Sequence, residues 1–165
     1  MELLFPDVKI GRVVAELAWK IDLKALPDLV LVGVLKGAYV FMADLTRSMQ
    51  TLHTVDFLEV QSYRGGTKSM GQVELVRDLS LDIRGKNVIV VEDIYDTGKT
   101  WKFLKPHLEI RQPKSLALLA LVKKRSHPDL LYPEDILTVS EGVFVVGYGM
   151  DHLGKMRNLP HIFAL

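Results

Sequence analysis

The sequence predicts an α/β protein with a central, mostly parallel sheet flanked by helices. Continuous apolar runs over 29–34, 88–91 and 116–122 have the composition of strands that are buried on both faces. Segments with apolar residues at helical spacing alternate with these runs, and such βαβ alternation is typical of parallel sheets. The length of 165 residues and a hydrophobic content of 48% suit a single domain over 1–165.

Each expected element follows from its own pattern. The first is a helix, because Ile10, Val13, Val14, Leu17 and Ala18 recur at three- and four-residue spacing. The next is a buried strand over 29–34, which follows the turn residues Pro27 and Asp28. The remaining elements, in chain order, are a helix over 38–49, a strand over 55–60, a strand over 87–91, a helix over 101–110 that ends before Pro113, and strands over 116–122 and 143–146.

Composition limits the class of function. A formal charge of +1 argues against a generally basic nucleic-acid binder. The chain contains no cysteine, which excludes a disulfide framework and thiolate chemistry and fits the cytosol. The apolar runs are far shorter than the roughly 18 residues of a membrane helix, and the first residues do not resemble a signal peptide. We therefore expect a cytoplasmic protein with neither nucleic acid nor a membrane as its partner.

The most informative segment is 90–100, with the sequence Val-Val-Glu-Asp-Ile-Tyr-Asp-Thr-Gly-Lys-Thr. Glu92 and Asp93 follow a buried strand, and ligands of open α/β sheets bind outside the carboxyl ends of the strands. The next helix then begins at 97–100, where free backbone N–H groups and the helix dipole favour an anion. The segment therefore predicts a site for a phosphorylated sugar.

Two other interpretations of this segment explain fewer of its residues. Gly98-Lys99-Thr100 is also the last triplet of a P-loop, but that motif needs a glycine five residues before Gly98, where this chain has Asp93. An ordinary turn with a capping side chain at Asp96 or Thr97 explains one polar residue and leaves the paired acids without a reason.

Two acids after a hydrophobic strand, followed by Asp-Thr-Gly-Lys-Thr, resemble the phosphoribosyl-pyrophosphate (PRPP) motif of the type I phosphoribosyltransferases. Further similarities between about 31 and 157 indicate the 6-oxopurine, hypoxanthine-guanine branch. The resemblance implies the type I phosphoribosyltransferase fold, with a small hood subdomain. It also implies that Glu92 and Asp93 fix the ribose hydroxyls, directly or through a metal. The segment with Asp96, Thr97, Gly98, Lys99 and Thr100 would bind the 5′-phosphate.

Two further segments resemble parts of the same family. Leu35-Lys36-Gly37 follows a buried strand, and in the family a similar turn with a cis peptide presents Lys36 and Gly37 to pyrophosphate; a plain strand-to-helix turn is the alternative. Ser62 and Tyr63 open a segment over about 62–75, rich in glycine and small polar residues. The resemblance implies a flexible loop that closes over the reacting centre and keeps out water. An ordinary hairpin connection is the alternative.

The end of the strand over 116–122 resembles the purine site. The matching family lysine donates a hydrogen bond to the purine O6, and Lys123 holds that place if the preceding Leu-Val pair fixes the register. Lys124 replaces it if the alignment shifts by one residue. A solvated basic strand end is the other interpretation.

The segment over 143–151 completes the resemblance. Phe144 matches a residue that stacks on the base, and Val145 one that gives it backbone hydrogen bonds. Asp151 matches a residue that binds Mg²⁺, and it also belongs to the implied purine site, near the 2-position of the base. Arg157 matches an arginine that contacts pyrophosphate.

The reaction implied is Mg²⁺-dependent transfer of the phosphoribosyl group from PRPP to N9 of hypoxanthine, guanine or xanthine. Asp96 would act as general acid or base near N7 of the purine. Metal contacts would come from Asp151, Glu92 and Asp93, and the family suggests a homodimer or homotetramer. The alternatives are a phosphoribosyltransferase for another base and a nucleotide-responsive regulator of nucleic acid on the same fold.

Overall fold

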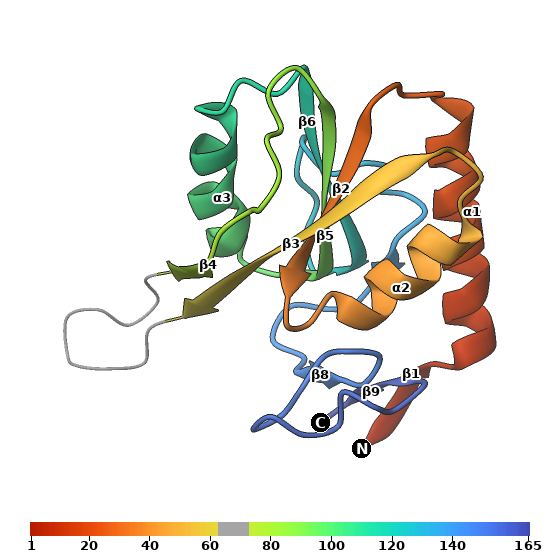
Figure 1. Cartoon of the computed structure of the whole chain (residues 1–165). Helices are drawn as coiled ribbons and strands as arrows, with labels where there is room; N and C mark the ends of the chain where they lie inside the picture. Colours follow the sequence, from red (N-terminus) through yellow and green to blue (C-terminus); the bar gives the residue numbers. More distant parts are fainter. Residues whose placement is uncertain (63–72) are drawn as a thin grey trace.

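The main sheet has six strands in the order β4-β3-β2-β5-β6-β7, in a computed structural model that describes residues 1–62 and 73–165 (Figure 1). Strand β4 is antiparallel to β3, and the other neighbours are parallel. The predicted mostly parallel sheet is therefore confirmed. Its strands are β2 (Leu29–Leu35), β3 (His53–Ser62), β4 (Val73–Arg77), β5 (Asn87–Tyr95), β6 (Ser115–Lys123) and β7 (Leu137–Thr138).

Strands β2, β5 and β6 lie side by side at the centre, where their apolar runs are buried on both faces. The register pairs Leu29 with Asn87 in the first pair and Tyr95 with Lys123 in the second. Because the strands are parallel, the polar residues that follow each of them meet at one edge of the sheet.

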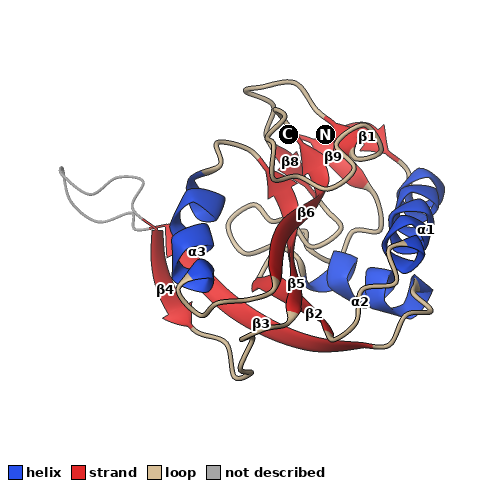
Figure 2. Cartoon of the chain, turned by 90° about the horizontal axis from the view of Figure 1, so that it is seen from above, coloured by secondary structure: helices blue, strands red, loops and turns tan. Residues whose placement is uncertain are grey.

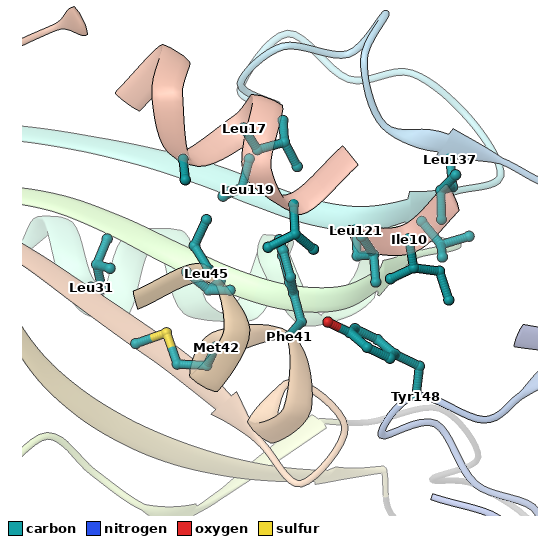
Figure 3. Close-up of a cluster of buried hydrophobic side chains, with 14 of the residues drawn as sticks. Ile10, Leu17, Leu31, Phe41, Met42, Leu45, Leu119, Leu121, Leu137 and Tyr148 are labelled. Carbon is teal, nitrogen blue, oxygen red and sulfur yellow. The ribbon is translucent and has the colours of Figure 1, made fainter. Parts of the chain in front are cut away.

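Helices cover both faces of the sheet (Figure 2). α1 (Asp7–Leu23) and α2 (Tyr39–Ser48) lie on one face, and α3 (Lys99–Glu109) lies on the other. Successive side chains of each central strand point to opposite faces of the sheet. Leu31 packs with the hydrophobic cluster under α1 and α2 (Figure 3), whereas Val32 packs with the cluster under α3. Complete burial of such a side chain contributes about 1.5–3 kcal/mol to folding.

A second sheet lies beyond the carboxyl ends of the main strands (Figure 1). It joins β1 (Glu2–Phe5), β9 (Ile162–Ala164) and β8 (Val145–Val146) in antiparallel pairs. The strand expected over 143–146 is therefore shorter than predicted, and it belongs to this sheet and not to the parallel one. The chain ends meet here in a small second subdomain.

Other differences from the expected elements are confined to short strands and ends. Strands β1, β4, β7 and β9 were not predicted, because two to five residues with mixed polarity carry little pattern. Of the predicted loop over 62–75, Ser62 ends β3 and 73–75 lie in β4, while Tyr63 and the rest of 63–72 lie outside the described residues. In the described part of the chain, none of the helices is long and apolar enough to cross a membrane.

Candidate active site

Strand β5 carries the predicted acids, and a short turn connects it to α3. Glu92 is buried and Asp93 half-buried, both inside the strand, which continues to Tyr95. Gly98 has a φ of +76°, and a Cβ atom there would lie 2.4 Å from the Tyr95 hydroxyl. Only glycine fits this corner without displacement. α3 begins at Lys99 without a side-chain cap from Gly98, which leaves first-turn amides available to an anion.

A cavity of about 360 Å³ opens at this corner, beyond the ends of β2 and β5. It brings together three segments that lie far apart in the sequence. The residues of its lining that the sequence had assigned to the site are Lys36, Gly37, Glu92, Asp93, Asp96, Thr97, Gly98, Lys99, Thr100, Asp151 and Arg157. The residues assigned from sequence to ribose, phosphate and pyrophosphate therefore share one cavity.

The turn after β2 forms one wall of this cavity. The Leu35–Lys36 peptide bond is cis, and Gly37 follows it. A Cβ atom on Gly37 would lie 1.8 Å from Oδ2 of Asp93, so the carboxylate rests directly against the glycine. The ammonium of Lys36 is exposed and lies 3.9 Å from the carboxylate of Glu59.

A second part of the lining carries an arginine–carboxylate pair. The Arg157 guanidinium lies 2.8 Å from Oδ1 of Asp151 and also donates a hydrogen bond to the carbonyl of Gly149 at 2.7 Å. The other Asp151 oxygen accepts a 2.6 Å hydrogen bond from the Gly154 amide. Both side chains are thereby held in place before any ligand binds.

Burial shifts the protonation of the paired acids. It raises the pKa of Glu92 to about 8, with a further contribution from the neighbouring charge of Asp93. Burial also raises the pKa of Asp93 to about 6, although the Ile94 amide and Arg157 oppose the shift. Two carboxyl groups with raised pKa values are suited to partners that supply hydrogen-bond donors or positive charge, such as ribose hydroxyls or a cation.

Glu92→Gln is expected to flatten the dependence of stability on pH. The Glu92 pKa rises from 4.5 to about 8 on folding, so the native state retains a proton that the unfolded chain has lost. The free energy of unfolding of the wild type should therefore fall as pH rises across this interval, by up to about 1.4 kcal/mol per pH unit. Urea unfolding between pH 5 and 9, in EDTA, measures the effect. An exposed control is Glu109→Gln, and equal pH profiles for wild type and Glu92→Gln would contradict the expectation.

A second cavity of about 580 Å³ adjoins the first, and Asp93, Asp96 and Asp151 line both. Apolar surface comes from Phe144, which is 50% exposed and meets the His152 ring edge-on at 5.7 Å between centroids. The remaining lining residues are Ile94, Lys124, Val145, Met150, Leu153 and Gly154. A partly apolar cavity with a few charged groups suits a flat polar heterocycle.

The structure places Lys124 at this cavity and Lys123 away from it. The Lys124 ammonium lies 2.8 Å from Oδ2 of Asp96, whereas the Lys123 ammonium is bonded to the carbonyl of Pro133. Successive side chains of a strand point to opposite faces, so only one of the two lysines can face the cavity. Of the two lysines considered for the purine contact, Lys123 therefore does not lie at this cavity, contrary to the first assignment, and Lys124 does.

Several lining residues carried no signal of their own in the sequence. Ile94 lies between the acids of the PRPP motif, and its place on β5 could have indicated contact with the ligand. His152 directly follows Asp151, but a single histidine in an irregular segment is not distinctive. Phe144, Val145 and Asp151, in contrast, lie at the cavity as the sequence predicted.

Comparison with known proteins supports this geometry. Residues 5–152 match the phosphoribosyl transferase domain. The hypoxanthine phosphoribosyltransferase of Escherichia coli K12 is 40% identical over 98% of this chain and 93% of its own length. The hypoxanthine-guanine phosphoribosyltransferase of Aquifex aeolicus is 37% identical over 100% of this chain and 94% of its own length.

Solved structures agree in fold. A hypoxanthine-guanine phosphoribosyltransferase from Bacillus anthracis superposes with a TM-score of 0.87 at 36% identity, covering 100% of this chain and 98% of that one. A hypoxanthine phosphoribosyltransferase from Staphylococcus aureus gives a TM-score of 0.87 at 34% identity, covering 99% and 90%. This chain therefore belongs to the phosphoribosyltransferase family, in its hypoxanthine-guanine branch.

Proposed function

We propose that the protein serves purine salvage by transferring the 5-phosphoribosyl group of PRPP to N9 of hypoxanthine or guanine, with release of pyrophosphate. The observation that carries this proposal is the pair of adjoining cavities, which share Ile94 and the three acids Asp93, Asp96 and Asp151. One cavity has the groups for a sugar phosphate and the other those for a purine. A reaction that joins the two molecules would take place at the shared residues.

The smaller cavity would hold PRPP. The amides and hydroxyls over 97–100 would bind the 5′-phosphate at the start of α3. Glu92 and Asp93 would accept hydrogen bonds from the ribose hydroxyls. Lys36 and Arg157, which both line this cavity, would hold the pyrophosphate and its negative charge.

The donor set fits Mg²⁺ bound together with its substrate. Asp93 and Asp151 line the same cavity, and Mg²⁺ commonly binds one or two carboxylates plus substrate phosphates. The described residues contain no cluster of three metal-ligating side chains, so pyrophosphate and ribose oxygens would complete the coordination. We assign the protein contacts to these two acids, with Glu92 nearby. When bound, the metal would neutralise the charge that accumulates on departing pyrophosphate.

The protein would act by orientation and by electrostatic stabilisation. Departure of pyrophosphate leaves positive charge on the ribose ring, which the carboxylates of Asp93 and Asp96, both in the cavity lining, would stabilise. The N9 atom of the purine attacks C1 as the bond to pyrophosphate breaks, and the carboxylate of Asp96 accepts the proton that N7 loses. Fixing both reactants in adjoining cavities supplies the proximity that the reaction needs.

Recognition of a 6-oxopurine would depend on Lys124. Its ammonium lies beside Asp96 in the larger cavity and would donate to the purine O6. Lys124→Ala is expected to lower kcat/KM for hypoxanthine about tenfold or more, because a charge-assisted hydrogen bond contributes about 1.5–3 kcal/mol. The loss for adenine should be smaller, since adenine has no O6.

Lys123→Ala is the matched control for this prediction. Its ammonium binds the carbonyl of Pro133, so its loss should affect stability and leave the ratio of hypoxanthine to adenine activity unchanged. Steady-state rates with both bases measure this ratio. If Lys123→Ala changes it and Lys124→Ala does not, the assignment of the purine contact is wrong.

The experiment that tests the function is an initial-rate panel with PRPP and hypoxanthine, guanine, xanthine, adenine, uracil or orotate. Parallel assays contain Mg²⁺ or EDTA. Metal-dependent turnover of 6-oxopurines alone supports the proposal and ranks the bases. Turnover of another base would identify a different phosphoribosyltransferase, and PRPP binding without any turnover would indicate a regulatory protein.

We further propose that the protein acts in the cytoplasm as a homodimer or homotetramer. The family resemblance supports this proposal. Light scattering after size-exclusion chromatography measures the assembly, and a monomer at micromolar concentration would contradict it.

A further inference from the structure

Tyr148 lies outside both cavities but connects two elements that shape them. Its side chain is buried, with 7% of the residue exposed, and packs in the core cluster beneath α1 and α2. Figure 3 shows the ring pointing toward α2, close to Phe41. Its hydroxyl donates a 2.5 Å hydrogen bond to Oδ2 of Asp44 on α2. Burial and the Asp44 carboxylate both raise the pKa of Tyr148, which keeps the hydroxyl a neutral donor.

The backbone around Tyr148 is bent in an uncommon way. Its φ is +50°, and those of Gly147 and Gly149 are +94° and +97°. Positive φ is rare for a bulky residue, so the surrounding contacts must hold the turn in this form. One such contact is the amide of Tyr148, which donates to the carbonyl of Leu159 at 2.8 Å.

The same turn supports the pyrophosphate side of the smaller cavity. The Gly149 amide donates to the carbonyl of Arg157 at 2.9 Å, and the Arg157 guanidinium donates back to the carbonyl of Gly149 at 2.7 Å. Arg157 also holds Asp151. A Cβ atom on Gly149 would lie 2.2 Å from the carbonyl oxygen of Gly37, so the two backbones are in direct contact.

Helix α2 completes the connection from the other side. It begins at Tyr39, directly after the Lys36–Gly37 turn, and carries Asp44 on its second turn. The Asp44–Tyr148 hydrogen bond therefore ties the wall with Gly37 to the wall with Asp151 and Arg157. The second Asp44 oxygen lies 3.6 Å from Arg47, on the exposed side of the helix.

We propose that Asp44 and Tyr148 are positioning residues for the pyrophosphate end of the substrate. This inference rests on the proposed function, since it concerns the site assigned there to pyrophosphate. Neither side chain lines the purine cavity. Loss of their hydrogen bond should therefore lower the affinity for PRPP and pyrophosphate and leave the affinity for the purine unchanged.

Tyr148→Phe tests the proposal, because it removes the hydroxyl and keeps the ring. We expect the KM for PRPP and the inhibition constant of pyrophosphate to rise together by about five- to tenfold. This is less than the full effect of one hydrogen bond to a charged group, because the bond acts on the substrate only through the wall that it holds. The KM for hypoxanthine should stay within twofold of wild type. Asp44→Ala should reproduce the effect, and Asp44→Asn, which retains an acceptor oxygen, should restore most of the affinity.

Tyr132→Phe is the matched control. This tyrosine is also partly buried and donates a single hydrogen bond, at 2.9 Å to the carbonyl of Lys20 on α1, and it lines neither active-site cavity. Thermal melting of both variants compares their stabilities. The proposal is supported if both lose similar stability but only Tyr148→Phe loses affinity for PRPP and pyrophosphate.

If the wild type turns over a 6-oxopurine, any one of three results would overturn the proposal. They are unchanged PRPP and pyrophosphate constants in Tyr148→Phe, the same rise in Tyr132→Phe, or an equal rise in the KM for hypoxanthine. The first shows that the bond does not position the site, and the others show general loosening of the fold. Failure of the wild type to turn over any 6-oxopurine would instead refute the proposed function, so the two failures are distinguishable.

Discussion

Asp96→Asn is expected to lower kcat for hypoxanthine by at least about 100-fold, the lower range for general acid–base catalysis. Asp96 lines both cavities and lies between the predicted positions of sugar and base. Asparagine keeps the size of the side chain and an acceptor oxygen for Lys124, but it cannot exchange a proton with the purine or stabilise positive charge. The KM for PRPP should therefore change by no more than about threefold. Steady-state kinetics with each substrate varied in turn measures both constants.

Asp129→Asn is a suitable control for Asp96→Asn. Asp129 also accepts a 2.7 Å hydrogen bond from a lysine, Lys105, but lies beside α3 and lines neither active-site cavity. Its kcat should match wild type. If Asp96→Asn retains wild-type kcat, or if both variants lose activity equally, Asp96 has no part in the chemistry.

Gly37→Ala is expected to reduce kcat/KM for PRPP by about 100-fold. The added Cβ would lie 1.8 Å from Oδ2 of Asp93, so the carboxylate or the turn must move by more than an ångström. A displacement of about 1 Å in a site that depends on orientation costs about 100-fold in rate. The backbone at Gly37 does not have a positive φ, so the predicted loss arises from the contact itself.

Gly11→Ala gives the opposite expectation for the same substitution. A Cβ atom on Gly11 would meet no atom within 4 Å, and the residue lies inside α1. Alanine should therefore raise the free energy of unfolding by about 0.5–1 kcal/mol without changing the kinetics. Urea unfolding and PRPP kinetics on both variants test the pair. Wild-type kcat/KM in Gly37→Ala would show that the cavity tolerates movement of Asp93.

The sequence was most informative where one local pattern combined an element with its chemistry. The segment over 87–100 predicted a strand, a phosphate-binding turn and a helix start, and the structure has β5, the Gly98 corner and α3 there. The fold class followed from the same kind of pattern, repeated along the chain. In these cases the residues that determine the structure are neighbours in sequence.

Prediction failed where the outcome depended on distant partners. The choice between Lys123 and Lys124 is a choice of strand face, which depends on pairing with β5 and on the Pro133 carbonyl that receives Lys123. Strand β8 was assigned to the wrong sheet because its partner, β9, is only three residues long and is separated from β8 by a stretch without regular elements. The hydrogen bond between Asp44 and Tyr148 spans 104 positions, and neither residue shows it in its local pattern.

The small sheet has a practical consequence for protein engineering. β1 pairs with β9, β9 pairs with β8, and β8 carries Val145 of the purine cavity. Figure 1 shows both termini at this sheet. An affinity tag or fusion partner at either end would thus be attached two strands or fewer from the base-binding residues. Joining the ends by a short peptide and opening the chain between α3 and β6, on the far side of the molecule, would place a fusion well away from the substrate.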